Sequence, residues 1–358
     1  MSSQDRTLDR YQELMQINAA SHLLRAAREL GLFDALRGGQ KTEAQLVSLL
    51  SIRPQALRLL LESLISMSVV EKYGDDHALA PVMQLLCQYD ADLGDALWGR
   101  LAATSKEGGE EGQSAGSTDD YLDGLTATQW VHTPAAMQVA EMLDLGGGSV
   151  VQEIDMEAGP DGMEVAIALG PQASAPSGQG SASRPPLRIL DLGCGSAVWS
   201  CAMAYRDGRA RVTAIDTPAR LAAATSTAES IRLGDRFETI AGDPDKVELP
   251  PNAFDLVVIA QRLHALGSAA RDRLLDRARE ALATGGRIVL IDLFRGPAKA
   301  RLAETIEALK IFIATPGEVQ SAEDLRAKLL ARGLTDIRFS FIAASRVNLG
   351  LVVASEPG

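Results

Sequence analysis

Cysteine, long apolar runs and net positive charge are all scarce in this chain, and each scarcity excludes a class of protein. The 358 residues include three cysteines, Cys87, Cys194 and Cys201, which are too few and too scattered for a disulfide framework or a zinc site. We therefore expect no metal centre. No apolar stretch approaches the roughly 18 residues that a membrane-spanning helix needs. Because the amino end, 1–10, is polar and charged, we expect a cytoplasmic protein with no membrane partner.

The charge balance is negative. A formal net charge of -12 argues against nucleic acid as the main partner, because phosphate binding depends on clustered Lys and Arg. The composition, 46% hydrophobic and 23% charged, is ordinary for a globular protein, and the length allows two domains.

The amino-terminal part has the pattern of three helices followed by a hairpin. An apolar face over 19–30, a capping box at Thr42 and Gln45, and Pro54 before a leucine stripe predict the helices. The run 69–79, interrupted by a glycine and an aspartate, predicts the hairpin. We therefore expect an α-helical winged-helix domain over 1–100.

A winged helix can bind DNA, and this is one alternative function. Between Glu13 and Ala80, however, the sequence has seven cationic and eight acidic residues. This balance is a poor basis for phosphate contacts. The leucine-rich faces favour burial in a homodimer instead. The following segment, 101–186, is expected to be a connector, with a loop over 105–120, a helical pattern over 123–145, a hairpin over 150–169 and a flexible linker over 170–186.

The most informative stretch is 187–197, an apolar run that closes on Asp191-Leu192-Gly193-Cys194-Gly195-Ser196-Ala197. We call residues 191–197 the glycine loop. A buried strand that breaks into a glycine turn and then a helix lets a ligand touch the backbone. A second acid, Asp216, ends the next expected strand, 211–216, where a carboxylate can accept both hydroxyls of a ribose. The pattern predicts a nucleoside-cofactor site, although a tight turn without a ligand is the alternative.

The glycine loop does not favour a dinucleotide. Such folds usually have a third small residue where this chain has Val198. Ala197 stands where a last glycine would be, and we expect it to have helical dihedral angles. Further strands are expected over 237–241, 254–260 and 287–293, and their apolar runs are typical of a doubly wound parallel α/β sheet. A helix over 321–333 and an antiparallel pair, 337–342 with 347–354, are expected to end the chain.

At this point the chain resembles the dimeric small-molecule O-methyltransferases of the class I, S-adenosylmethionine-dependent type, over 19–86 and 188–354. The marks of the resemblance are Leu30-Gly31-Leu32-Phe33-Asp34-Ala35-Leu36, the glycine loop, Asp216-Thr217-Pro218, Gly242-Asp243, Leu263-His264 and Ala281-Leu282-Ala283-Thr284-Gly285-Gly286-Arg287. It implies a Rossmann-like methyltransferase domain over 187–358 behind the winged-helix dimerisation domain. It also implies S-adenosylmethionine as the cofactor. The residues expected to bind it are Asp191, Gly193, Gly195, Asp216, Gly242 and Asp243.

The resemblance implies that His264 is the general base that takes the proton of the acceptor hydroxyl. Imidazole is the side chain most readily able to do so near neutral pH. The family's His-Asp-Trp sequence is broken here, because Ala265 and Leu266 follow the histidine. The later acid that commonly orients the base is also displaced, since Val319 aligns there and Glu318 lies one position early. A structural histidine is the alternative.

We therefore expect an S-adenosylmethionine-dependent O-methyltransferase, acting on a hydroxyl of a small aromatic or polyketide-like metabolite. A helix is expected over 300–313; the resemblance implies that it caps the acceptor pocket, and covering the sheet is the alternative. The alternatives are a non-catalytic cofactor-binding or regulatory protein with the same fold, and a winged-helix DNA binder with a ligand-sensing domain.

Overall fold

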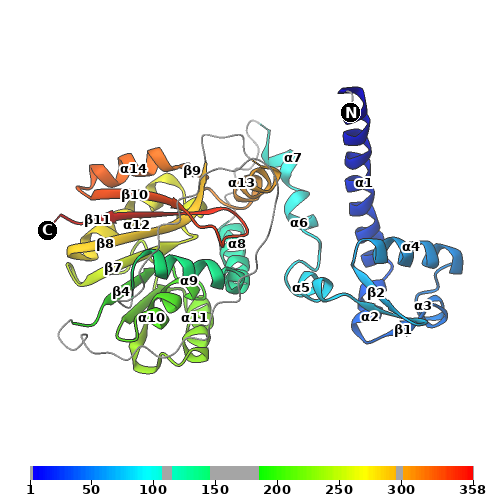
Figure 1. The fold of residues 1–358 in the computed structure, drawn as a ribbon, viewed down its shortest axis with the longest axis horizontal. Coiled ribbons are helices and arrows are strands. Elements are labelled where there is room, and N and C mark those ends of the chain that lie inside the picture. Colours follow the sequence, from blue (N-terminus) through cyan, green and yellow to red (C-terminus); the bar gives the residue numbers. More distant parts are fainter. Residues whose placement is uncertain (1–2, 107–114, 146–184, 296–300, 358) are drawn as a thin grey trace, which may run out of the picture. The chain divides into compact units, whose positions relative to one another are not determined.

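A computed structural model describes residues 3–106, 115–145, 185–295 and 301–357. The chain divides into two compact units, Met1–Lys106 and Glu107–Gly358, which we call unit 1 and unit 2 (Figure 1). The hairpin expected over 150–169 lies outside the described residues, as does most of the linker expected over 170–186.

Unit 1 contains helices and a small antiparallel sheet, as the sequence predicts. The helices are α1 (Ser3–Glu29), α2 (Leu32–Arg37), α3 (Glu43–Leu50), α4 (Pro54–Ser66), α5 (Pro81–Tyr89), α6 (Asp95–Trp98) and α7 (Leu101–Thr104). The strands β1 (Lys41–Thr42), β2 (Val70–Tyr73) and β3 (Asp76–Leu79) are arranged in the order β1-β3-β2. The expected capping box is confirmed, because the Thr42 hydroxyl accepts from the Gln45 backbone N–H at 3.2 Å. Pro54 is the first residue of α4, and β2 with β3 forms the expected hairpin.

The first half of α1 carries apolar side chains that unit 1 does not cover. Leu8, Tyr11, Leu14, Met15 and Ile17 are 50 to 61% exposed, and we call them the α1 stripe. The buried core of unit 1 lies farther along the chain, around Leu32, Leu46 and Leu57. A contiguous exposed apolar surface of this kind marks a site of association.

Unit 2 is built on a doubly wound sheet. Five parallel strands, β4 (Arg188–Leu192), β5 (Arg211–Asp216), β6 (Phe237–Ala241), β7 (Phe254–Ala260) and β8 (Leu282–Arg295), are followed by the antiparallel β10 (Thr335–Phe341) and β11 (Leu349–Ser355). The order is β10-β11-β8-β7-β4-β5-β6, with β9 (Gln320–Ser321) beside β8. The chain leaves β4 toward β5 and later returns to β7 on the other side, so a crevice opens at the carboxyl ends of these strands. The sheet confirms the Rossmann-like fold.

Helices cover both faces of this sheet (Figure 1). On one face α9 (Thr133–Met142), α10 (Val198–Arg206) and α11 (Pro218–Ser230) share a core with alternate strand residues, and on the other α12 (Ser268–Ala281) and α14 (Ala322–Ala331) do so. The remaining helical elements are α8 (Ala115–Thr128), η1 (Gln129–His132), η2 (Gly234–Arg236), η3 (Leu263–Ala265) and α13 (Leu302–Ala314). The strands are apolar runs because both of their faces are covered.

One expectation for the segment before the sheet needs correction. The loop expected over 105–120 gives way to α8, which begins at Ala115. The helical pattern expected over 123–145 is confirmed, because this range contains the end of α8, then η1 and α9. Pro134 lies in the first turn of α9, and a proline there has no N–H to continue the preceding helix.

The expectation for Ala197 was wrong. This residue caps α10 with φ 56° and ψ 23°, in the left-handed region, which costs a residue with a side chain roughly 1 kcal/mol or more. Gly193 and Gly195 of the same loop also have positive φ, 77° and 56°. The strained alanine is fully buried, so surrounding packing holds it in place.

Replacement of Ala197 by glycine should leave stability nearly unchanged. Relief of the left-handed strain, roughly 1 kcal/mol, offsets the loss of a buried methyl group, about 0.8 kcal/mol. In contrast, Ala202→Gly, at a buried position inside α10, loses both the methyl group and helix propensity, about 2 kcal/mol together. Urea unfolding of the two variants measures the difference. Equal destabilisation would show that Ala197 is unstrained.

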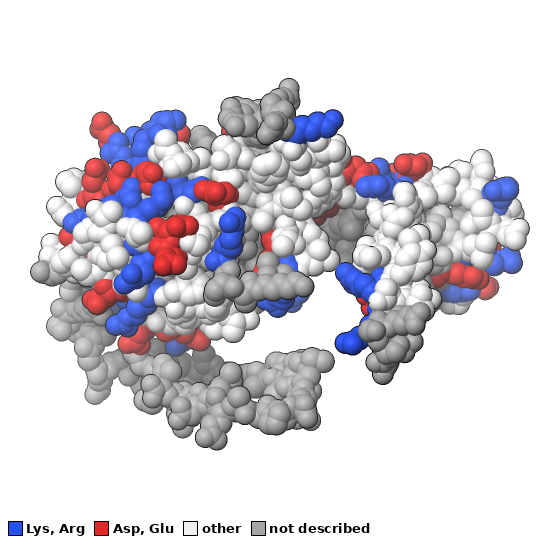
Figure 2. All heavy atoms as spheres, turned by 90° about the horizontal axis from the view of Figure 1, so that it is seen from above, with Lys and Arg blue, Asp and Glu red and all other residues white. Residues whose placement is uncertain are grey.

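Charged side chains are mixed in sign over the surface of unit 2. In Figure 2, Lys and Arg lie among Asp and Glu on the visible face and do not form one large positive patch. Across the described ranges, no helix has both the length and the apolar character needed to cross a membrane.

Candidate functional site

Asp216 and the glycine loop meet at the carboxyl ends of β4 and β5. Asp216 is fully buried, and its Oδ2 accepts the backbone N–H of Gly195 at 3.0 Å. Its Oδ1 accepts the N–H of Thr217 at 2.8 Å. The acid at the end of β5 and the glycine loop, both predicted from the sequence as parts of one site, are therefore joined by a direct hydrogen bond.

Two arginines share the space above Asp216. The Nη1 of Arg220 lies 3.3 Å from Oδ1 of the aspartate, and the Nη1 of Arg262 lies 4.0 Å from the same oxygen. Burial lowers the pKa of Arg262, although the charge of Asp216 opposes the shift. The Nε of Arg262 is buried with no hydrogen-bond partner among the described residues, so this side chain has unused capacity to donate.

Helix α8 and the following 3-10 turn lie over the glycine loop. Arg220, on α11, donates to Asp119 of α8 at 2.9 Å and to Asp123 at 2.8 Å. The Oε1 of Gln129 accepts both the backbone N–H and the hydroxyl of Ser196 at 2.9 Å. Since Arg220 also contacts Asp216, one buried guanidinium joins α8 to the floor of the site.

The glycines permit close contact with their neighbours. A Cβ added to Gly193 would lie 3.1 Å from Cδ of Arg262, and one added to Gly195 would lie 3.0 Å from Oε1 of Gln129. A bare backbone beside a strand-end acid is the donor and acceptor set that a nucleoside cofactor needs, so the residues fit the group.

The cavity at this place is small. Its lining comprises Leu122, Leu125, Thr126, Gln129, Gly193, Gly195, Asp216, Arg220, Ala260, Gln261 and Arg262. It measures about 10 Å³, which is about the room of one water molecule. Admission of a nucleoside therefore requires the Arg262 side chain or α8 to move.

The other predicted cofactor residues do not line this cavity. Asp191 is buried and accepts the hydroxyl of Ser200, and its other oxygen has no partner among the described residues. Burial raises the pKa of Asp191 to about 7, with the Ser200 bond opposing and Asp216 adding to the shift. Gly242 donates its N–H to the carbonyl of Asp216 at 3.1 Å. Asp243 is partly exposed and bonds Lys246 at 2.6 Å.

His264 lies at the same edge of the sheet, in η3 after β7. It is 2% exposed. Its Nδ1 contacts Oδ1 of Asp292, and its backbone N–H donates to Oδ2 of that residue at 3.2 Å. Its Nε2 is 2.9 Å from the hydroxyl of Tyr121 on α8. An imidazole held by a carboxylate on one nitrogen presents the other as a proton acceptor.

Neither partner of His264 was predicted from the sequence. Glu318, the acid nearest to the expected orienting position, has a 69% exposed side chain and contacts Arg271 at 3.5 Å. The acid that contacts the Nδ1 of His264 is Asp292 on β8. The sequence does mark Asp292 as unusual, because it is the single acid within the otherwise apolar run 288–293. Tyr121 had no comparable signal, since nothing in the local pattern indicates which way α8 faces.

A second buried histidine lies beside the glycine-loop helix. His132 contacts the Nε2 of Gln261 at 3.0 Å and stacks on Trp199, with ring centroids 5.9 Å apart. Burial lowers its pKa to about 4. The folded chain therefore holds a neutral imidazole here at pH values where an unfolded chain is protonated.

His132 should make stability depend on pH between about 6.5 and 4. Over that window the unfolded state binds a proton that the folded state does not, so stability falls as the pH falls, by roughly 2 to 3 kcal/mol in total. Urea midpoints measured from pH 7 to 4.5 should fall less steeply for His132→Gln than for the unchanged protein. The exposed His22 provides the control, His22→Gln. An unaltered slope in His132→Gln would contradict the assignment.

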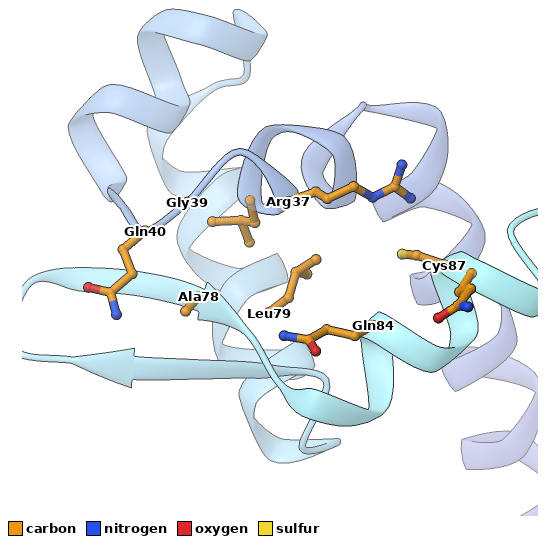
Figure 3. A pocket seen from close by; sticks show the side chains of 9 residues that line it. Arg37, Gly39, Gln40, Ala78, Leu79, Gln84 and Cys87 are labelled. Atoms are coloured by element: carbon orange, nitrogen blue, oxygen red, sulfur yellow. The ribbon is translucent and has the colours of Figure 1, made fainter. Parts of the chain in front are cut away.

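Other candidate sites carry less chemistry. Among the described residues, no three His, Cys, Asp or Glu side chains are grouped so that they could hold a metal ion. A larger cavity of about 560 Å³ lies in unit 1, lined in part by Arg37, Gln40, Gln84 and Cys87 (Figure 3). It brings together no acid with a base, so the edge of the sheet in unit 2 is the better candidate.

Comparison with known proteins agrees with this geometry. A family model described as "Methyltransferase domain" matches residues 189–286, and one described as "O-methyltransferase dimerisation domain" matches residues 12–88. Acetylserotonin O-methyltransferase of Mus musculus is 24% identical over 345 residues, which cover 89% of this chain and 81% of the mouse protein. The N,N-dimethyltransferase OxyT of Streptomyces rimosus is 24% identical over 364 residues, covering 96% of each.

Solved structures share the fold at low identity. Human N-acetylserotonin methyltransferase in complex with SAM has a TM-score of 0.65 and 17% identity, over 100% of this chain and 99% of that one. The mitomycin 7-O-methyltransferase MmcR has a TM-score of 0.68 and 18% identity, over 99% of both chains. These structures show a shared fold. The two family models and the full-length relatives identify this chain as an S-adenosylmethionine-dependent methyltransferase that carries an O-methyltransferase dimerisation domain.

Proposed function

We propose that this protein methylates a hydroxyl of a small aromatic or polyketide-like molecule, with His264 as the base. The observation that carries the proposal is the His264–Asp292 pair, which lies at the same edge of the sheet as Asp216 and the glycine loop. A base beside a cofactor site is the arrangement that proton removal during methyl transfer requires.

The residues around Asp216 would hold the cofactor, which supplies an electrophilic sulfonium methyl group when bound. Asp216 would accept the ribose hydroxyls, and the bare backbone of Gly193 and Gly195 would allow close approach. Asp243, next to Gly242, would meet the adenine amino group after a change of its contact with Lys246. In this proposal Asp191 does not contact the cofactor. Its bond with Ser200 of α10 would instead hold the glycine loop in place.

Asp292 gives His264 its direction. Its carboxylate accepts from Nδ1, so the lone pair of Nε2 is left to receive a proton. Burial of the pair excludes water and strengthens the attraction between the carboxylate and an imidazolium. Much of the remaining rate would come from holding donor and acceptor in line.

The acceptor class is supported by the relatives. Their names include acetylserotonin O-methyltransferase and demethylspheroidene O-methyltransferase, and one solved neighbour is a mitomycin 7-O-methyltransferase. Another relative is a phenazine-1-carboxylate N-methyltransferase of Pseudomonas aeruginosa, so acceptors with nitrogen belong in any screen.

Calorimetry and turnover test the proposal together. Titration with S-adenosylmethionine and S-adenosylhomocysteine should give saturable binding, and a panel of phenols should release S-adenosylhomocysteine. His264→Ala should retain the binding and lose turnover. Unchanged turnover in that variant would remove the base role.

A non-catalytic cofactor-binding protein is the second candidate, because Tyr121 already contacts the Nε2 of His264 and the cavity is small. Tight binding of S-adenosylmethionine with no release of S-adenosylhomocysteine from any acceptor would favour it.

The homodimer is proposed to form through unit 1, with a second copy of this chain covering the α1 stripe. Light scattering of Tyr11→Glu/Met15→Glu tests this, since two buried charges at an interface without partners are costly. A dimer mass retained by that variant would place the interface elsewhere.

A further inference from the structure

The Tyr121 hydroxyl occupies the Nε2 of His264, the ring nitrogen that Asp292 does not contact. The imidazole is 2% exposed, with Asp292 on one ring nitrogen and the Tyr121 hydroxyl on the other. The two rings meet edge to face, with centroids 5.7 Å apart and planes at 88°. Tyr121 is less buried than His264, so it is the more accessible member of the pair.

The carboxylate of Asp292 sets the direction of the two hydrogen bonds of His264, because an ionised carboxylate can only accept. Because Asp292 accepts from Nδ1, Nε2 has a lone pair, and the Tyr121 hydroxyl donates to it. Burial, with the carboxylates of Glu307 and Asp292, raises the pKa of Tyr121 above its usual value. The phenol therefore keeps its proton at rest, while its oxygen retains lone pairs that can accept another.

The position of Tyr121 on α8 brings it close to the cofactor site. Leu122 and Leu125, from the same helix, line the cavity beside Asp216, and Asp119 and Asp123 bind Arg220. The helix therefore presents one side chain to the base and the neighbouring ones to the glycine-loop cavity.

We propose that the Tyr121 hydroxyl is the group that contacts the acceptor, and that it relays the acceptor's proton to His264. This inference rests on the proposed methyl transfer. As the new bond from the acceptor oxygen to the methyl carbon forms, the acceptor O–H bond breaks and its proton passes to the oxygen of Tyr121. The tyrosine's own proton passes to Nε2, giving an imidazolium paired with Asp292. The electron pair of the broken sulfur–carbon bond remains on sulfur, and the tyrosine ends neutral.

Tyr121→Phe tests the relay by its dependence on acceptor acidity. With phenol, which is not ionised near neutral pH, kcat should fall by about 100- to 10,000-fold, the range for loss of general acid–base catalysis. With 4-nitrophenol, which ionises without help, the loss should be under about tenfold on the same reasoning. The dissociation constant of S-adenosylhomocysteine should stay within twofold, which shows that the cofactor site is intact. Tyr205→Phe, on an exposed tyrosine of α10, is the matched control and should leave all three values unchanged.

A rate for Tyr121→Phe equal to or above that of the unchanged protein, with phenol as acceptor, would overturn the relay and make Tyr121 a cover over His264. A second measurement needs no acceptor. Nitrogen-15 spectra of histidine-labelled protein should show His264 with a proton on Nδ1 and a hydrogen-bonded Nε2 that loses its bond in Tyr121→Phe. Protonation of Nε2, or an Nε2 signal unaffected by the substitution, would also overturn the relay, independently of whether the unchanged protein methylates any phenol.

Discussion

Asp292→Asn should lower kcat by about 1,000-fold, within the range for loss of an oriented general base. The amide is nearly isosteric but carries no charge, so it neither stabilises an imidazolium nor holds Nδ1 as firmly in its protonated form. Because Asp292 is separate from the glycine-loop cavity lining, the affinity for S-adenosylhomocysteine should not change. Initial rates at saturating S-adenosylmethionine, together with calorimetry, measure both effects.

Glu318→Gln is the matched control for that variant. Glu318 is the acid that alignment of the sequence brings nearest to the orienting position, yet it is exposed and contacts Arg271. The Glu318 carboxylate is solvated and its contact with Arg271 is long, at 3.5 Å, so kcat should stay within about twofold of the unchanged value. The reverse result, a large loss in Glu318→Gln and none in Asp292→Asn, would show that the catalytic geometry differs from the one described.

Asp216→Asn should weaken binding of S-adenosylmethionine and S-adenosylhomocysteine by about 100-fold, equivalent to about 2.7 kcal/mol. Two ribose hydroxyls would each lose a hydrogen bond to a charged acceptor, and each such bond is worth about 1.5 kcal/mol or more. Arg220 keeps Asp119 and Asp123 as partners in the variant, so the fold should survive. Calorimetric titration gives the affinity, and a thermal melt in the absence of cofactor checks the fold.

The control for this second variant is Asp235→Asn. Asp235 has an 88% exposed side chain near Arg211, and its loss should not affect either ligand. An Asp216→Asn protein that melts normally and binds both ligands at unchanged affinity would remove Asp216 from the cofactor site.

The sheet was predictable because its residues obey simple rules. The strand 254–260 is apolar except for Asp255, and the acid at the end of 211–216 lies where a parallel sheet places ligands. The caps at Thr42 and Ser321 were readable for the same reason, since each depends on residues three positions apart. Periodicity and local hydrogen bonding carry this information, and both are present in a single sequence.

The parts that could not be predicted depend on contacts between distant segments. Tyr121 and His264 are separated by 143 positions, and Arg220 reaches Asp119 over 101. No local pattern specifies such a meeting. The prediction for Ala197 was wrong for a related reason. Whether an alanine is forced to positive φ depends on how tightly α10 must follow β4, and the packing of the whole loop determines this.

The bridge from Arg220 to both α8 and Asp216 has a kinetic consequence. A nucleoside is too large for a cavity of about 10 Å³. Binding of the cofactor therefore requires a prior movement of α8 or of the Arg262 side chain. In rapid-mixing experiments the observed rate constant for binding should therefore reach a plateau as the cofactor concentration rises, and the plateau value gives the rate of that movement. Replacement of Asp119 and Asp123, whose carboxylates bind Arg220, should raise that plateau. Helix α8 would then determine the rate of cofactor binding as well as the shape of the site.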